Sequence, residues 1–581
     1  LAVEDEGVSP MIFYRTDCAD MALSEADIDP DLIASAGAVV VTGTHFSRPH
    51  SEAAQRKAIR IARENGPDAL GFYVSGQLLT EDYYVFNKLA KGLLGTNNID
   101  TNSRLCMSSA VAGYKLTLGA DAPPACYDDV NHADCLFIIG SNAAYAHPVL
   151  FRRIEDARRA RPGMKVIVAD PRRTDTAGLA DLYLPLQPGT DVMLFHGMLH
   201  LMLWEGWTDP AWIAQHTTGF DELKALVRDA TPARVAATCG LREADLITAA
   251  RWFALGGDQP PARRGATLSL YGQGLNQSSS GTAKNANLIN LHLATGQIGR
   301  PGAAPLSLTG QPNAMGGREV GGLAPLLPGH RELANAEHRA EVAALWGVRE
   351  LPATPGHTAL DLFRAAAEGE IQALWIVCTN PAASLPDQAL VRRALERCEF
   401  VVLQEASRTT ATAPFADLLL PAASWAEKEG TVTNSERCIS RVRRAVPPPG
   451  QARADWAIAA DVGQRFAACL GRDASTFQAT SARLDWADAE SVWLEHREAT
   501  RGRDCDITGL NWPMLEAAPR QWPWPQGAQA PTPRLFTDGG FATPDGRARF
   551  AAPAWRGTAE ARDAHYPVSL TTGRLRDAWH G

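Results

Sequence analysis

The chain has 581 residues, of which 45% are hydrophobic and 21% charged, and its formal net charge is −9. This length exceeds one ordinary hydrophobic core, and the composition excludes a disordered chain. The acidic balance argues against a nucleic-acid partner, which needs clustered Lys and Arg, and no apolar run reaches the roughly 20 residues that span a membrane.

The first ten residues, LAVEDEGVSP, are acidic and lack the basic and apolar regions of a secretory signal. A start on Leu suggests a processed chain or a fragment. The ten cysteines are irregularly spaced and contain no C-x-x-C pair, which argues against a zinc ribbon or a self-contained iron–sulfur loop. We therefore expect reduced thiols and a cytoplasmic location.

The first distinctive stretch, NSRLCMSSAVAG, begins at Asn102 and places Cys106 before a run of small residues. Ser, Ala and Gly give a helix a thin face, against whose first turn a bulky group can lie. We expect Cys106 in a loop that leads into this helix. Its residue type leaves three readings open: a buried packing residue, a nucleophile, or a ligand to a group outside the chain.

Four strand signals further along the chain recur as two pairs. DCLFIIGSN (134–142) resembles ALWIVCTNP (373–381), and KVIVADPRRTDTAGLADLYLP (165–185) resembles FVVLQEASRTTATAPFADLLLP (400–421). Asn142 and Asn380 are 238 residues apart, and Asp181 and Asp417 are 236 apart. This nearly constant offset predicts two related α/β units.

Near-continuous apolar strands indicate parallel sheets covered by helices on both faces. Ligands of such sheets bind outside the carboxyl ends of the strands. Asp170 and Glu405 each end a strand, where a carboxylate can accept hydrogen bonds from a ribose or a guanine edge; the alternative is that each caps a helix. Two similar units suggest two similar ligands, which we expect to be nucleotides.

A segment crowded with Gly, Asn, Gln and Ser, from Ser269 to Gly322, lies between the paired motifs. Gly permits close backbone approach, and side-chain amides donate and accept hydrogen bonds at once. We expect this segment to line the site of a large polar ligand. The sequence lacks a G-x-x-x-x-G-K-[ST] loop, which disfavours a nucleoside triphosphatase.

From about residue 67 to the end, the sequence resembles the cytoplasmic assimilatory nitrate reductases of bacteria, which are molybdenum bis(molybdopterin guanine dinucleotide) oxidoreductases. The motifs that carry the resemblance are NSRLCMSSAVAGYK, GSNAAYAHPVLFRR, DPRRTDTA, PGTD, GLNQSSSGT, LTGQPNAMGGREVGGL, CTNPAASLPD, EKEGTVTNSER and TTGRLRDAWHG. The implied fold has two related doubly wound parallel-sheet domains, followed by the truncated start of a C-terminal β-barrel.

The resemblance implies a role for each matching residue. Cys106 is the expected thiolate ligand of molybdenum, Met107 is expected to line the substrate funnel, and Arg318 is expected to bind the nitrate anion beside Met315. The residues expected to hold the pterins and phosphates are Gln77, Asn102, Gly140, Ser141, Asn142, His147, Gln277, Thr572, Gly573, Arg574, Trp579 and His580. One guanosine is expected at Asp170, Arg172, Thr174, Gly189 and Asp191, and the other at Asn380, Gln404, Glu405, Lys428 and Asp455.

The implied reaction is oxygen-atom transfer from nitrate, with the protein supplying orientation and charge. The implied electron donor is ferredoxin, flavodoxin or an NAD(P)H-dependent reductase subunit. The family also carries a four-iron–four-sulfur cluster held by four cysteines, but only Cys18 precedes Cys106 here. We therefore expect that the chain as given does not reduce nitrate with a physiological donor.

AGAVVVTGTHFS (36–47) predicts a strand with its loop, and SEAAQRKAIRIAREN (51–65) predicts an amphipathic helix. With these motifs, residues of about 10–65 resemble an internal piece of a 5-dehydro-2-deoxygluconokinase, a ribokinase-like sugar kinase. The expected organisation is a kinase-like fragment at 1–65, α/β domains at 66–450 with halves at about 105–265 and 340–450, a connecting region at 451–560, and the barrel start at 561–581. The alternatives are a formate dehydrogenase-like molybdoenzyme, a non-catalytic remnant, or a sugar kinase fragment. Met107 after the cysteine, in place of His, favours nitrate.

Overall fold

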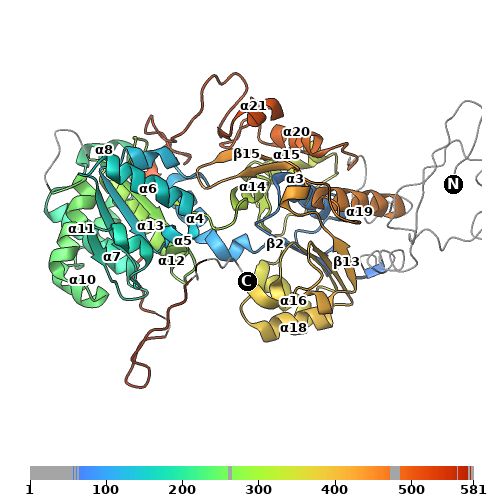
Figure 1. Cartoon of the computed structure of the whole chain (residues 1–581), viewed down its shortest axis with the longest axis horizontal. Coiled ribbons are helices and arrows are strands. Elements are labelled where there is room, and N and C mark those ends of the chain that lie inside the picture. The colour runs from blue at the N-terminus through green and yellow to red at the C-terminus, as the bar shows by residue number, and fades with distance from the viewer. Residues whose placement is uncertain are drawn as a thin grey trace, which may run out of the picture.

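The computed structural model describes residues 57, 60, 61, 64–258, 265–470, 484–558, 560–573 and 576. In this part of the chain, two five-stranded parallel sheets lie side by side, each with helices on both faces (Figure 1). The predicted α/β fold with parallel sheets is confirmed. Within the same residues, no helix is long and apolar enough to cross a membrane.

The first sheet has the strand order β5-β4-β3-β7-β8. Alternate residues of β3 enter different cores: Phe137 packs under α7, α11 and α13, whereas Ile138 packs under α6. The strands are β3 (Cys135–Ile139), β4 (Lys165–Ala169), β5 (Leu182–Leu184), β7 (Thr267–Tyr271) and β8 (Ala304–Ser307), and the helices α6 (Pro148–Ala160), α7 (Asp191–Trp204), α10 (Pro232–Cys239), α11 (Glu243–Leu255) and α13 (Gly281–Ala294).

The second sheet has the strand order β13-β12-β11-β1-β2 and is covered in the same way. Trp375 of β11 enters the core under α3 and α19, whereas Ile376 enters the core under α16 and α18. The strands are β1 (Leu70–Val74), β2 (Ile99–Thr101), β11 (Ala373–Val377), β12 (Phe400–Glu405) and β13 (Leu418–Pro421), and the helices α3 (Thr80–Asn87), α15 (Ala336–Trp346), α16 (Ala359–Glu368), α18 (Gln388–Arg397) and α19 (Asp455–Leu470).

The two units are interleaved along the chain. The predicted halves, at about 105–265 and 340–450, were each one continuous segment and left out two strands of each sheet. Strands β1 and β2 precede the first unit in sequence but pair in the second sheet, and β7 and β8 extend the first sheet to residue 307. The paired motifs revealed only the three strands that share sequence. The other two strands of each sheet are related by position alone.

The same hydrogen bonds recur in both units. Asp181 accepts a hydrogen bond from the backbone N of Val166 at 2.8 Å, and Asp417 accepts one from Val401 N at 2.8 Å. In both cases the Asp directly precedes one strand, and its carboxylate accepts from a backbone N–H near the start of the neighbouring strand. These two acids therefore hold neighbouring strands together at the edge opposite the ligand side.

Two buried threonines fasten the asparagines that follow β3 and β11. The Thr176 hydroxyl donates to Asn142 Oδ1 at 2.9 Å and accepts from Ala144 N at 3.0 Å. The Thr412 hydroxyl donates to Asn380 Oδ1 at 2.8 Å and accepts from the backbone N of residue 382 at 3.2 Å. The predicted duplication thus extends to side-chain contacts at the carboxyl ends of the strands.

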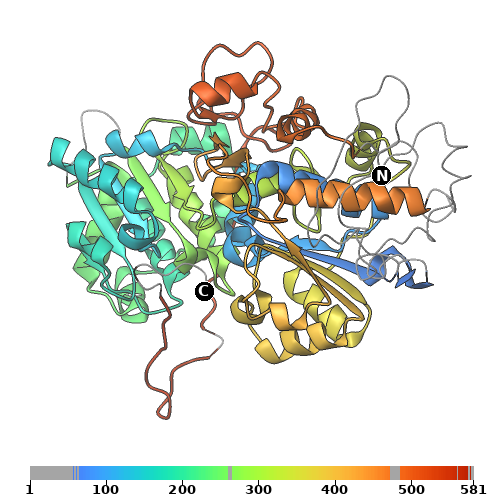
Figure 2. The same cartoon turned by 45° about the vertical axis from the view of Figure 1, so that its right-hand side comes forward.

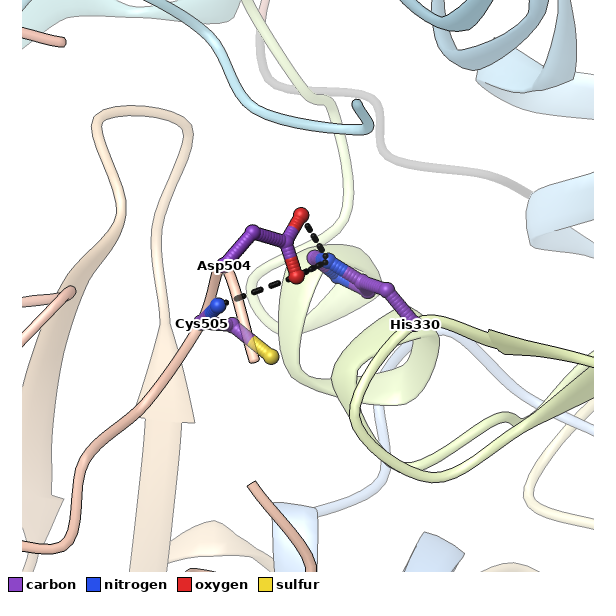
Figure 3. A group of neighbouring side chains, drawn as sticks. All are labelled: His330, Asp504 and Cys505. Atoms are coloured by element: carbon purple, nitrogen blue, oxygen red, sulfur yellow. Dashed lines mark hydrogen bonds and ion pairs between the residues drawn. The ribbon is translucent and has the colours of Figure 1, made fainter. Parts of the chain in front are cut away.

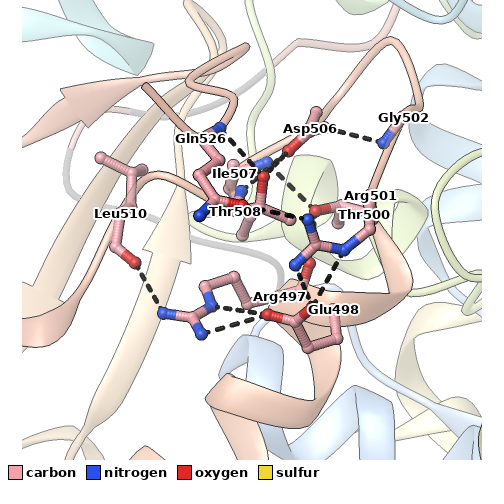
Figure 4. A network of polar contacts seen from close by, with 10 residues as sticks. All are labelled: Arg497, Glu498, Thr500, Arg501, Gly502, Asp506, Ile507, Thr508, Leu510 and Gln526. Atoms are coloured by element: carbon pink, nitrogen blue, oxygen red, sulfur yellow. Dashed lines mark hydrogen bonds and ion pairs between the residues drawn. The ribbon is translucent and has the colours of Figure 1, made fainter. Parts of the chain in front are cut away.

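A third layer lies along one edge of both units (Figures 1 and 2). It contains the antiparallel strands β14 (Gly430–Thr433), β15 (Cys438–Val442) and β16 (Arg520–Gln521), with helices α14 (Ala314–Glu319), α20 (Ala489–Ala499) and α21 (Trp512–Ala517). Polar contacts fix its loops: Arg497 donates to Leu510 O at 3.1 Å, and Asp506 accepts from Gly502 N at 2.7 Å (Figure 4). The predicted connecting region is therefore folded against the α/β units.

The two predicted end segments have different outcomes. Most of residues 1–65, including the strand expected around Val39–Val41, lies outside the described residues. Residues 560–573 are described, and they form no strand there, while Tyr566, Val568 and Leu570 are largely exposed. The expected barrel start is therefore not formed as strand in the described part of the segment.

We predict that Thr176→Val and Thr412→Val each lower the free energy of unfolding by about 1–3 kcal/mol, because each removes a buried hydroxyl between two polar partners. Chemical denaturation monitored by tryptophan fluorescence measures the loss. Thr238→Val is the control, since its exposed hydroxyl bonds only to Arg234 O. Equal stability of the two variants and the control would contradict this role.

Candidate functional site

Helix α4 (Ser103–Leu118) joins the two α/β units. It begins directly after β2 of the second sheet and packs against α13 of the first unit. The close approach needs small residues: a Cβ at Gly113 would lie 2.6 Å from Asn285 Cβ. The thin face that the sequence predicted is thus occupied by α13, and the first turn of α4 lies where the two units meet.

Cys106 lies inside α4, not in the loop that we expected before the helix. The helix is distorted immediately after it, because Met107 has non-helical angles of φ −146° and ψ 15°. The Cys106 side chain is buried, and Gln273 of α12 (Gln273–Asn276) donates a hydrogen bond to its Sγ at 3.2 Å. Cys106 therefore faces the carboxyl end of β7 in the first sheet.

Arg318 of α14 brings the other predicted catalytic residues together. Its side chain is buried, and its Nη atoms lie 3.0 Å from the sulfur atoms of Met107 and Met315. On the opposite side, Nε donates to Asp121 Oδ2 at 2.6 Å. Thioether sulfur is a weak acceptor, so the guanidinium is fixed by one carboxylate and keeps donor capacity beside Met107.

A cavity of about 750 Å³ opens at the carboxyl ends of the first sheet, and its lining includes Gln273, the hydrogen-bond partner of Cys106. Its walls include all five residues predicted for one guanosine, Asp170, Arg172, Thr174, Gly189 and Asp191. They also include six of the residues predicted for the pterins and phosphates: Gly140, Ser141, Asn142, Gln277, Thr572 and Gly573. Residues that we did not predict also line it: Tyr145, Gln187, Gln273, Gly274, Ser278, Ser279, Lys284, Gly310 and Thr558. A large polar ligand fits this volume and lining.

The cavity floor depends on two glycines. Gly140 has a φ of 58°, and Gly274 N donates to Gly140 O at 2.9 Å. A Cβ on Gly274 would lie 2.5 Å from Gly140 Cα. The two loops that follow β3 and β7 therefore meet backbone to backbone, which leaves the space above them free.

The cavity contains both acidic and basic side chains, which can form hydrogen bonds with a polar ligand. Lys284 forms an ion pair with Asp191 at 2.8 Å. Burial raises the pKa of Asp170, whose Oδ1 accepts a hydrogen bond from Arg172 N at 2.9 Å. Asp170 is not the N-cap of a named helix, which favours the ligand reading of this acid over the capping alternative.

The second unit places its predicted residues in a more buried arrangement. Gln404 donates to Asp455 Oδ1 at 2.7 Å, and Lys428 forms ion pairs with Asp455 and with Asp82 Oδ2, the latter at 3.0 Å. Burial alone would lower the pKa of Lys428, but the two carboxylates raise it. Asn380 and Glu405 occupy the places that Asn142 and Asp170 occupy in the first unit.

Residues 52–465 match the family model Molybdopterin oxidoreductase. The chain belongs to the molybdopterin oxidoreductase family. This confirms the family resemblance predicted from the sequence. The match begins inside the segment 10–65 that we compared with a sugar kinase, so residues 52–65 are covered by the molybdopterin oxidoreductase model.

Two curated relatives carry the name nitrate reductase. The protein of Synechocystis sp. is 44% identical over 531 residues, which cover 90% of this chain and 72% of the relative. The protein of Klebsiella oxytoca is 44% identical over 552 residues, which cover 93% of this chain and 60% of the relative. Acetylene hydratase from Pelobacter acetylenicus has the same fold, with a TM-score of 0.61, 20% identity, and 86% of this chain and 66% of that chain covered.

The site fits the molybdenum–pterin cofactor that the family implies. Gln273, which donates to the Cys106 sulfur, lines the polar cavity together with Gly140 and Gly274, which meet backbone to backbone at its floor. Asp121 Oδ1 is buried without a hydrogen-bond partner in the described part of the chain, and so is available to a group at the junction. Soft sulfur ligands and adjacent hydrogen-bond donors are the environment that such a metal requires.

Among the described residues, the remaining predicted ones do not line the cavity of the first unit. Asn102 accepts hydrogen bonds from Gly76 N and from Gln311, and so holds the half-buried loop that contains Gln77. His147 Nε2 lies 2.7 Å from Thr309 O. Arg574, Trp579 and His580 lie outside the described residues.

Sequence reasoning missed Asp82, Asp121, Gln273 and Lys284. Gln273 and Lys284 belong to the polar segment 269–322 that was predicted to line a ligand, although neither was singled out. Asp82 lies in the first turn of α3 and Asp121 follows α4, and neither belongs to a sequence motif. Only their contacts with Lys428 and Arg318 identify them.

We predict that Lys428→Met lowers the free energy of unfolding by about 3–5 kcal/mol, because Asp82 and Asp455 remain buried without a cation. Without Lys428, burial raises the folded-state pKa of Asp82 further, so the loss grows as the pH rises above the unfolded value near 3.8. Denaturation series at acid and neutral pH measure it. Lys115→Met, which removes a partly exposed pair with Glu332, should cost less than about 1 kcal/mol.

Proposed function

We propose that the chain carries the catalytic centre of a molybdenum-dependent nitrate reductase that holds two molybdopterin guanine dinucleotides. The observation that supports this most strongly is the buried Arg318, which contacts Met107 and Met315, while Cys106 packs with Met107 and with Ala314 of the same helix as Arg318. A fixed cation next to a thiolate position and two apolar thioethers suits a small planar anion. The relatives named nitrate reductase agree with that choice.

Arg318 binds and orients the anion in this proposal. A guanidinium presents parallel N–H groups in one plane, which matches two oxygens of a planar anion such as nitrate. Replacing weak sulfur acceptors with anionic oxygens strengthens these hydrogen bonds, whereas the Asp121 pair keeps the plane of the guanidinium fixed. The surrounding burial excludes bulk water from the anion.

The two units would each hold one guanosine of the cofactor. Asp170, Arg172, Thr174, Gly189 and Asp191 form the first position, and Asn380 with Glu405 and the Gln404–Asp455–Lys428 network forms the second. Cys106 would bind the metal, and Gln273 would donate a hydrogen bond to that sulfur. When bound, the cofactor supplies the two electrons of the reduction and accepts the oxygen atom.

We also propose a cytoplasmic location. The eight described cysteines form no disulfide with one another, as expected for thiols in a reducing compartment. Cell fractionation tests this, and recovery of the protein in a periplasmic fraction would contradict it.

We predict that Cys106→Ala abolishes nitrite formation and removes molybdenum from the protein, because the substitution deletes the proposed metal ligand. The assay is expression with molybdate, metal analysis, and nitrite production from nitrate with a reduced viologen dye as donor. Cys398→Ala, a buried cysteine in the core of the second unit, is the control. Formate oxidation without nitrite formation by the unsubstituted chain would support the formate dehydrogenase alternative instead.

We predict that Arg318→Lys lowers kcat/KM for nitrate by about 10- to 100-fold, since a charged hydrogen bond contributes about 1.5–3 kcal/mol. The loss should lie mainly in KM if Arg318 binds nitrate before reaction. Arg441→Lys, another buried arginine that stacks on Trp512, is the control. An unchanged KM together with unchanged kcat would rule out the role of Arg318.

A further inference from the structure

A second cluster of side chains that can bind a metal ion lies at the turn that contacts the end of α14. His330 is in the turn between β9 (Leu326–Leu327) and β10 (Arg331–Glu332), and its Nδ1 lies 2.9 and 3.0 Å from the two carboxylate oxygens of Asp504. Cys505 is the next residue and is buried. One ligand atom from each of the three residues lies within 4.8 Å of the others (Figure 3).

The geometry of His330 has two features that its contact with Asp504 does not account for. The residue has a φ of 54°, in the left-handed region that few non-glycine residues adopt. Its side chain is only 8% exposed, and Nε2 has no hydrogen-bond partner in the described part of the chain. A buried imidazole with one nitrogen unsatisfied is unusual, and binding a metal ion is a common role for such a ring.

The surroundings hold the ring in place and leave one approach open. Trp522 packs edge-on against the His330 ring, with 5.7 Å between centroids, and donates to Glu319 Oε1 at 2.6 Å. The Asp504 side chain is 28% exposed. An ion can therefore reach the cluster past Asp504, whereas the imidazole and the thiol lie on the protein side.

We propose that His330, Asp504 and Cys505 bind one zinc ion, with water in the fourth position. Nitrogen, sulfur and carboxylate oxygen are the three ligand types of protein zinc sites, with bonds of about 2.0–2.3 Å. A tetrahedron with such bonds places its ligand atoms about 3.3–3.7 Å apart, which small side-chain rotations reach from the observed arrangement. A thiolate, a carboxylate and a neutral imidazole also balance the charge of Zn²⁺.

The ion would fasten the turn that supports α14. Gly329 N donates to Glu319 O at 2.7 Å, and Arg503 Nε donates to Gly329 O at 3.1 Å. The zinc would add a metal link between the same turn and residues 504–505. Because Glu319 follows Arg318 in α14, the link would steady the helix that carries the anion-binding arginine, but zinc binding itself does not depend on the proposed nitrate reduction.

The test is metal binding by the full chain after dialysis against a chelator. We expect one Zn²⁺ per chain, and one Co²⁺ per chain when Co²⁺ is added to the metal-free protein instead, with a thiolate-to-cobalt charge-transfer absorption that Zn²⁺ abolishes by displacing the weaker-binding Co²⁺. Cys505→Ser should remove that absorption, and both Cys505→Ser and His330→Asn should weaken Zn²⁺ binding by more than about 100-fold, beyond the effect of losing an outer partner. Asn tolerates the left-handed backbone at residue 330.

Cys398→Ser is the matched control, since Cys398 is a buried cysteine remote from the cluster, and it should leave Zn²⁺ affinity and the cobalt spectrum unchanged. Zinc should also raise the thermal unfolding midpoint of the original chain but not that of Cys505→Ser. Absence of a charge-transfer band in the original chain overturns the proposal, even if a variant does not fold. The same band in Cys505→Ser overturns it as well.

Discussion

The position of the candidate site depends on one connection, the passage of α4 from the second sheet into the first unit. Asn102, at the end of β2, holds the Gly76 loop, and Gly113 further along α4 permits contact with α13. Together these contacts hold α4 on both sides of Cys106. Cys106 is thereby placed beside Gln273, which follows β7 of the other sheet. The site belongs to neither unit alone.

Two buried cations, Lys428 and Arg318, differ in how fully carboxylates neutralise them. Lys428 is surrounded by Asp82 and Asp455, and burial of such a cluster requires full pairing. Among the described residues, Arg318 has one carboxylate partner, and its other partners are two sulfur atoms and a carbonyl oxygen. The first arrangement stabilises the framework, whereas the second retains an attraction for an incoming anion. Burial raises the strength of both interactions, but only one leaves donors for a ligand.

The two α/β units share the same stabilising contacts but differ at the proposed ligand positions. The Asn–Thr contacts and the Asp–backbone contacts recur with nearly the same distances. At the turn after the strand, however, Gly140 of the first unit corresponds to Cys378 of the second, and both have positive φ. Gly140 permits contact with Gly274, whereas the Cys378 thiol donates to Asp455 at 3.2 Å. The same backbone therefore supports an open cavity in one unit and a buried network in the other.

The sequence by itself determined the fold class and the duplication, because apolar strand runs and polar strand ends are local patterns. The same patterns named Asp170 and Glu405, whereas Arg172, Gly189 and Gln277 were named through the motifs that the chain shares with its family. Tertiary structure alone decided the interleaving of the sheets, since β1 and β7 share position but no motif. It alone paired Asp121 with Arg318, Asp82 with Lys428, and His330 with Asp504, because contacts between residues remote in sequence form only when the elements pack.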